Sequence, residues 1–160
     1  DKVVLASHAD ETLNIISDLT TQEKEILTNF KYRKNKAVIH SDESSMPKNR
    51  KAWCSWNSSL NPKNNQQSSV TYWLNQLQNL KIDKNIFLTI NPFFDINPDV
   101  IYNTIDFTHP YYDEKALENQ SKLSSIQNIN NTLYAGSYFG YGFHEDGIKS
   151  SIDMLKTLND

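Results

Sequence analysis

The sequence predicts an α+β fold, in which a mostly antiparallel sheet with helices is flanked by pieces of an α/β domain. Three observations predict it. The chain opens with a continuous apolar run at residues 3–6, typical of a strand covered on both faces in a parallel sheet. Its middle holds short runs rich in β-branched and aromatic residues. Its end holds an apolar run, a glycine-rich bend and an amphipathic helix.

The first elements are a strand, a polar turn and a helix, which together make half of a βαβ unit. Residues 7–10 include cap-forming side chains, and apolar residues recur at near-helical spacing over residues 11–19. We expect the parallel partners of this first strand to lie outside the sequence. A second helix is expected to begin at Thr20 or Thr21, because either hydroxyl can cap it.

The middle of the chain predicts an antiparallel sheet, because short strands follow one another through turns rather than through long crossovers. Polar linkers, including residues 58–69, separate these strands. Cys54 falls within one of the expected strands, between Trp53 and Trp56. This position favours a buried structural thiol over a nucleophile. The expected strands cover residues 32–40, 53–57, 70–75, 86–90 and 100–107, and a helix is expected over residues 114–123.

All the glycines of the chain lie between Gly136 and Gly147. Glycine permits a positive φ or a close approach of the backbone to a ligand. A strand, a glycine-rich bend and a helix N-terminus also present free N–H groups and a positive dipole end to an anion. A packed turn that closes the domain accounts for the same residues, so both interpretations stay open. The helix that follows has one mostly apolar face, marked by Ile148, Ser151, Ile152, Leu155 and Leu158.

Composition and motifs narrow the class of protein. The formal charge of −3 argues against binding to nucleic acid or to an anionic membrane surface, and no run approaches the roughly 20 apolar residues of a membrane span. A single cysteine excludes an internal disulfide framework, and a cytoplasmic protein is expected. The four histidines lack the spacing of a helical metal pair, so no metal site is expected. The chain has no nucleophile elbow and no complete nucleotide-binding fingerprint.

Seven stretches carry a resemblance that runs through nearly the whole chain. They are residues 3–10, 35–42, 46–47, 52–57, 70–78, 109–110 and 134–148. The run Gly140-Tyr-Gly-Phe-His-Glu-Asp-Gly147 is the most specific of them. With these stretches in this order, the chain resembles the C-terminal part of a flavin-containing amine oxidoreductase, in the subgroup of predicted NAD/FAD-binding proteins of the amine oxidase superfamily.

The resemblance implies a flavoenzyme whose chain alternates between an FAD-binding and a substrate-binding domain. Residues 1–19 resemble a returning strand and helix of the FAD domain. Residues 20–130 resemble the substrate-binding domain, and residues 131–160 resemble the final FAD-binding strand and helix. The N-terminal Rossmann unit is absent from the sequence. We therefore expect a fragment whose partner is the missing N-terminal half of the same protein. We also expect the isolated fragment to expose apolar surface, which favours a homo-oligomer.

The resemblance also assigns cofactor residues. Gly136 and Ser137 match a turn whose backbone approaches the FAD phosphates. Phe143 falls where amine oxidases often have a tyrosine beside the substrate, and His144 falls where a backbone N–H meets the pyrimidine edge of the flavin. No cysteine matches the one that holds flavin covalently in some relatives, so non-covalent FAD is expected. The whole stretch expected beside the flavin ring is Gly142, Phe143, His144, Glu145, Asp146 and Gly147.

The implied function is that of an FAD-dependent oxidoreductase, which transfers hydride from a small-molecule substrate to flavin N5. No catalytic residue is assigned, and the substrate stays open among amines, unsaturated lipids and carotenoid-like compounds. The fragment alone is expected to hold no FAD and to be inactive. The rival hypothesis is a non-catalytic binding or structural module on the same sheet, without a cofactor. Flavin absorbance of the full-length protein distinguishes the two.

Overall fold

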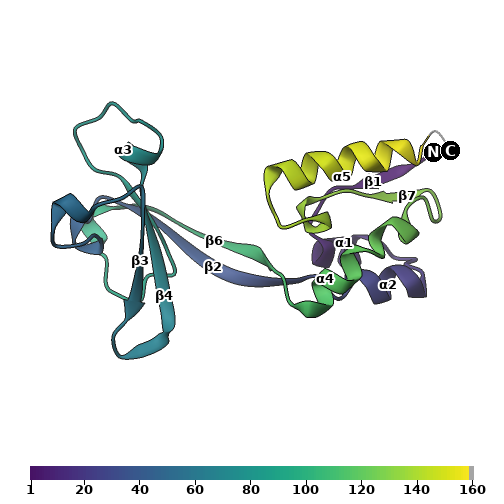
Figure 1. The fold of residues 1–160 in the computed structure, drawn as a ribbon, viewed down its shortest axis with the longest axis horizontal. Coiled ribbons are helices and arrows are strands. Elements are labelled where there is room, and N and C mark those ends of the chain that lie inside the picture. The colour runs from purple at the N-terminus through teal and green to yellow at the C-terminus, as the bar shows by residue number, and fades with distance from the viewer. Residues whose placement is uncertain (159–160) are drawn as a thin grey trace. The chain divides into compact units, whose positions relative to one another are not determined.

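The computed structural model describes residues 1–158, which form two compact units. Unit 1 combines residues 1–33 with the residues from 109 onward, and unit 2 comprises residues 34–108 (Figure 1). Unit 1 holds β1 (Val3–Leu5), α1 (Ala9–Ile15), α2 (Thr21–Leu27), α4 (Glu114–Gln120), the 3₁₀ turns η4 (Leu123–Ile126) and η5 (Ser137–Phe139), β7 (Thr132–Tyr134) and α5 (His144–Lys156).

Unit 2 is built on a five-stranded sheet with the order β3-β4-β5-β2-β6. The chain enters this unit within β2 and leaves it within β6. Its elements are β2 (Lys31–His40), η1 (Glu43–Ser45), η2 (Arg50–Ala52), β3 (Trp56–Asn61), β4 (Asn64–Trp73), α3 (Leu74–Leu77), β5 (Phe87–Ile90), η3 (Pro98–Val100) and β6 (Ile101–Tyr111). The antiparallel sheet with helices confirms the predicted α+β class.

Two expectations for the middle of the chain were wrong. Much of the predicted linker at residues 58–69 forms the β3–β4 hairpin, with Ser59 opposite Ser69. Polar residues conceal these strands because cross-strand pairing, rather than local propensity, stabilises them. Cys54 lies outside the strands and is exposed, so it is not a buried thiol.

Unit 1 contains a short parallel sheet of β1 and β7, in which Val3 lies opposite Thr132 and Leu5 opposite Tyr134. The expectation that β1 has no parallel partner in this sequence was therefore wrong. Coverage of the strand on both faces was also wrong, since Val3 is 57% exposed and Val4 48% exposed, whereas Leu5 is buried. The apolar run does form a strand, but the described residues leave Val3 and Val4 exposed, and these neighbours point to opposite faces of the strand.

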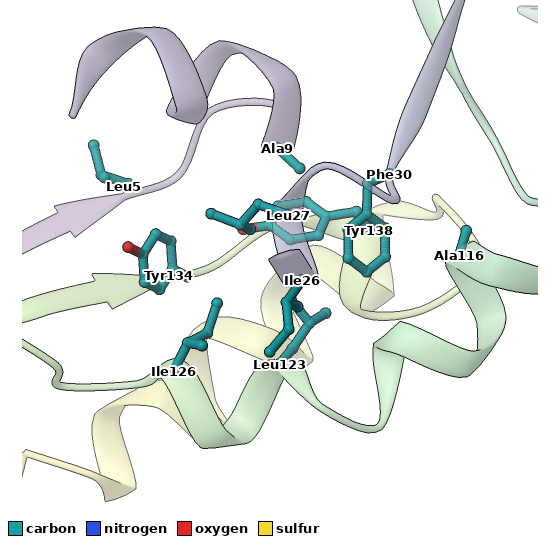
Figure 2. Packing of buried hydrophobic residues seen from close by; sticks show 10 residues of the cluster. All are labelled: Leu5, Ala9, Ile26, Leu27, Phe30, Ala116, Leu123, Ile126, Tyr134 and Tyr138. Carbon is teal, nitrogen blue, oxygen red and sulfur yellow. The ribbon is translucent and has the colours of Figure 1, made fainter. Parts of the chain in front are cut away.

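The core of unit 1 joins segments that are far apart in the sequence, as Figure 2 shows. Leu27 of α2, Leu123 and Ile126 of η4 and Tyr134 of β7 are fully buried in one cluster. The predicted cap at Thr20 is confirmed, because its hydroxyl accepts a hydrogen bond from the amide of Glu23. Packing thus places α2 and α4 in unit 1. The functional division into FAD-binding and substrate-binding parts at residues 19 and 131 stays a prediction.

The closing helix α5 forms as expected, but its apolar stripe does not face the core. Ile148, Ile152 and Leu155 are each more than half exposed, while Ser150 and Met154 are buried. The helix packs on η5 and β7, and its buried side carries Ser150 and Met154. Among residues 1–158, no helix combines the length and the apolar character needed to cross a membrane.

Candidate functional site

The glycine-rich segment follows the carboxyl end of β7. Because β1 and β7 are parallel, their carboxyl ends meet at one edge of the sheet, where open α/β sheets bind ligands. The turn after β1 reaches the same place, since a Cβ added to Gly136 would lie 3.7 Å from the carbonyl oxygen of Ser7. The topology therefore places residues 136–147 at the edge where a ligand is most expected.

All eight residues assigned by the resemblance lie in this bend and in the first turn of α5. Gly136 leads into η5, and Phe143 is the N-cap of α5. The structure brings the eight together because they are nearly contiguous in the sequence. Their role in holding a cofactor stays a prediction. They are Gly136, Ser137, Gly142, Phe143, His144, Glu145, Asp146 and Gly147.

Three of the glycines are required by the packing of the segment itself. Gly142 has a φ of 90°, in the left-handed region that disfavours side chains. A Cβ on Gly140 would collide with the carboxylate of Asp146, and one on Gly136 would lie 2.6 Å from the ring of Tyr138. The packed-turn interpretation therefore accounts for these three positions without any ligand.

Hydrogen bonds within the segment fix its shape. The carbonyl oxygen of Ser137 accepts the amides of Gly140 and Gly142, each at 3.1 Å. The Oδ2 of Asp146 accepts the amides of Tyr141 at 2.9 Å and Phe143 at 3.0 Å. This carboxylate caps the start of α5, so these two amides are not available to a ligand.

Three further side chains hold the segment from outside, and sequence reasoning missed all of them. Gln120 of α4 donates to the carbonyls of residues 138 and 140. Ser150 accepts the amide of Gly136 at 2.9 Å, and the phenol of Tyr112 donates to the carbonyl of Ser137 at 3.4 Å. The only feature of the sequence that pointed toward Tyr112 was its place two residues after the stretch 109–110, one of the seven stretches that carry the resemblance. No feature of the sequence pointed to Gln120 as a residue that holds the bend.

Free donors remain at the start of α5 and in the adjacent turn η5. Among residues 1–158, the amides of Ser137, His144 and Glu145 have no acceptor. A Cβ added to Gly147 would lie 3.8 Å from the amide nitrogen of Ser137 and meets no other atom, so this glycine leaves the donor uncovered. Amide donors at the positive end of a 13-residue helix fit an anionic or electron-rich group, such as a phosphate or the pyrimidine edge of a flavin. This part of the segment fits FAD.

Aromatic side chains stand beside these donors. Tyr141 and Phe143 are 69% and 70% exposed, and the centroid of the Tyr112 ring lies 6.5 Å from that of Tyr141. The described residues include no cluster of three or more His, Cys, Asp or Glu side chains suited to a metal ion. A pocket of about 360 Å³ adjoins the bend, lined by Gln120, Phe139, Gly140, Tyr141, Asp146, Lys149, Ser150 and Asp153.

Comparison with known proteins gives similarity to solved structures alone. No protein-family model matches the chain, and no curated protein matches it. The crystal structure of a CLA-producing fatty acid isomerase from P. acnes has a similar fold, with a TM-score of 0.58 and 17% sequence identity. The similarity covers 98% of this chain and 41% of the isomerase chain. The chain thus spans less than half the length of that protein, and what the two share at this identity is the fold.

Proposed function

We propose that this chain is part of a longer FAD-dependent oxidoreductase, in which the glycine-rich segment helps to hold a non-covalent flavin. The observation that carries the proposal is the set of free amides of His144 and Glu145 at the start of α5 and of Ser137 in η5 beside it. Their position at the carboxyl edge of a parallel sheet supports it, and so does the resemblance of residues 134–148 to the flavin-binding stretch of amine oxidoreductases.

A bound flavin would supply a hydride acceptor, and the residues of this chain would position it. The amides of the first turn of α5 would stabilise negative charge on the group that they face. The exposed rings of Tyr141 and Phe143 offer flat apolar surface beside it. Because Phe143 has no phenol, an amine-specific role of this position is not supported. We assign no general acid or base, since hydride transfer needs positioning above all.

The substrate that we propose is apolar, because one face of the unit 2 sheet is largely apolar and partly exposed. Trp56 and Leu60 of β3 are more than 60% exposed on this face. The strand register places further uncharged residues beside them, at Val70, Tyr72, Leu88 and Ile90. The likeness to a fatty acid isomerase favours an unsaturated fatty acid over an amine as the ligand of this face.

The partner that we propose for unit 1 is further α/β polypeptide of the same protein. A parallel pair of strands is marginal alone, and parallel sheets are normally buried on both faces. Val3 and Val4 of β1 and the stripe of Ile148, Ile152 and Leu155 on α5 are exposed in the described chain. Additional parallel strands and helices would cover both surfaces.

The full-length protein provides the test. We expect it to purify with flavin absorbance, and we expect an unsaturated fatty acid to bleach that absorbance anaerobically. A saturated fatty acid and an alkylamine of equal length are the controls. Bleaching by the amine alone would overturn the proposed substrate. A colourless protein that cannot be reconstituted with FAD would favour the non-catalytic module instead.

The 160-residue chain offers a second test. We expect it to bind no FAD in a titration followed by flavin fluorescence, because the free amides make up only part of a cofactor site. Tight binding by this chain alone would show that the cofactor site is complete without further polypeptide.

A further inference from the structure

The phenol of Tyr112 lies against the bend of the glycine-rich segment. Tyr112 follows the last residue of β6 and is half-buried. Its hydroxyl donates to the carbonyl of Ser137 at 3.4 Å. A Cβ added to Gly142 would lie 2.9 Å from the same phenol oxygen, so the phenol is in close contact with the backbone of the bend.

The Ser137 carbonyl, which accepts the hydrogen bond from this phenol, also connects the start of the bend to Gly140 and Gly142. The Ser137 oxygen also accepts the amides of Gly140 and Gly142, each at 3.1 Å. The same residue presents one of the free amides. A displacement of the Ser137 carbonyl therefore disturbs the left-handed turn at Gly142 directly, and it acts on the free Ser137 amide through the Cα atom that joins the two peptide groups.

The surroundings keep the Tyr112 phenol protonated. Burial raises its pKa above the ordinary value of 10.0, and the negative charge of Asp146 raises it further. A neutral phenol can donate to Ser137 throughout the physiological range. The other described donors to the Ser137 carbonyl are the amides of Gly140 and Gly142, so Tyr112 is the side chain that holds this carbonyl from outside the segment.

We infer that Tyr112 is a positioning residue of the flavin site, holding Ser137 and the Gly142 bend in the orientation that presents the free amides. This inference rests on the function proposed above. It assigns a role to a residue that lies outside the stretch aligned with the flavin ring. It also explains why a glycine is needed at position 142 on two grounds, namely its φ of 90° and the phenol beside it.

The test compares Tyr112→Phe with Tyr111→Phe in the full-length protein. Tyr111 is the matched control, because its ring lies under the guanidinium of Arg33 at 3.7 Å and has no contact with the bend among the described hydrogen bonds. We expect Tyr112→Phe to weaken FAD binding by about three- to tenfold, as for the loss of one hydrogen bond. We also expect it to shift the absorption maximum and the midpoint potential of the bound flavin.

A double-mutant cycle with Gly142→Ala tests the same contact without relying on one variant. The added methyl group meets the phenol oxygen, so Tyr112→Phe must recover part of the FAD affinity that Gly142→Ala loses. If the wild-type protein is yellow, two results would overturn the role of Tyr112. One is a Tyr112→Phe variant with the same flavin spectrum and FAD affinity as the wild type. The other is purely additive effects of Tyr112→Phe and Gly142→Ala on FAD affinity. A colourless wild-type protein would instead overturn the proposed function.

Discussion

The phenol of Tyr134 donates a hydrogen bond of 2.6 Å to Oε1 of Glu23 in the interior of unit 1. The two residues are 111 positions apart in the sequence, and both are buried. Oε2 of the same carboxylate accepts the amide of Thr20 at 2.8 Å and its hydroxyl at 2.7 Å. Burial, together with Glu23, raises the pKa of the Tyr134 phenol above its ordinary value, so the phenol remains a donor. The contact ties the start of α2 to β7.

Tyr134→Phe should therefore destabilise unit 1. The substitution removes one of the partners of a buried carboxylate, and hydrogen bonds to charged groups contribute about 1.5–3 kcal/mol. Urea unfolding followed by far-UV circular dichroism measures the change in the free energy of unfolding. Tyr141→Phe is the control, because that phenol is largely exposed, and an effect of equal size there would contradict the role of the buried pair.

Unit 2 should lose stability in mild acid through His40. This fully buried imidazole accepts the amide of Asp42 at Nδ1 and lies 2.8 Å from Oγ1 of Thr89 at Nε2. Burial lowers its pKa below the ordinary 6.5, although the charge of Asp42 opposes the shift. Below pH 6.5 the unfolded state therefore binds more protons at His40 than the folded state does. The contribution of His40 to the free energy of unfolding is fully present above pH 6.5 and is lost as the pH falls toward the lowered pKa.

The measurement is urea unfolding at pH 7.5 and at pH 5, followed by tryptophan fluorescence. All the tryptophans lie in unit 2, at positions 53, 56 and 73, so this signal reports that unit. We expect a lower midpoint at pH 5. His40→Asn should reduce the difference between the two pH values, whereas His144→Asn, at an exposed position, should leave it unchanged.

Gly147→Ala should separate ligand binding from folding. A Cβ at Gly147 makes only ordinary contact, and alanine favours a helix over glycine by up to about 1 kcal/mol, so the stability should hold or rise slightly. The methyl group would partly cover the free amide of Ser137, so FAD binding by the full-length protein should weaken. Equal FAD affinity in this variant and the wild type would count against that amide as a flavin contact.

Gly140→Ala is the contrasting variant. Its Cβ would collide with the carboxylate of Asp146 and displace it from the amides of Tyr141 and Phe143. We expect a loss of about 1–3 kcal/mol in the free energy of unfolding, as for overpacking. Thermal unfolding of the 160-residue chain gives this value without any cofactor.

Ile152→Glu should distinguish the described chain from the longer protein that we propose. In the 160-residue chain Ile152 is more than half exposed, so the change should stay within about 0.5 kcal/mol. If further polypeptide covers α5, the same change buries an unpaired charge and should cost about 3 kcal/mol in the full-length protein. Lys149→Glu, on the same helix and exposed, is the control. Equal effects of Ile152→Glu in both proteins would refute the proposed covering of α5.

Much of the local structure could be predicted because it depends on short-range pattern. The cap at Thr20, the strand at 87–90 and the helix after the glycine-rich bend follow from residues within one or two turns of each other. The bend itself was located by its glycines. The roles of its eight candidate residues in binding FAD remain predictions that local pattern cannot decide.

Taken alone, the sequence determined the α+β class, the position of the bend and the apolar stripe of α5, since each depends on local spacing. Only the tertiary structure decided that β1 pairs with β7, that the stripe of α5 is exposed and that Tyr112, Gln120 and Ser150 hold the bend. Periodicity identifies which side chains share a face, but the partner that covers the face is set by long-range packing. The glycine-rich segment accordingly has its shape from its own residues and its orientation from side chains outside it.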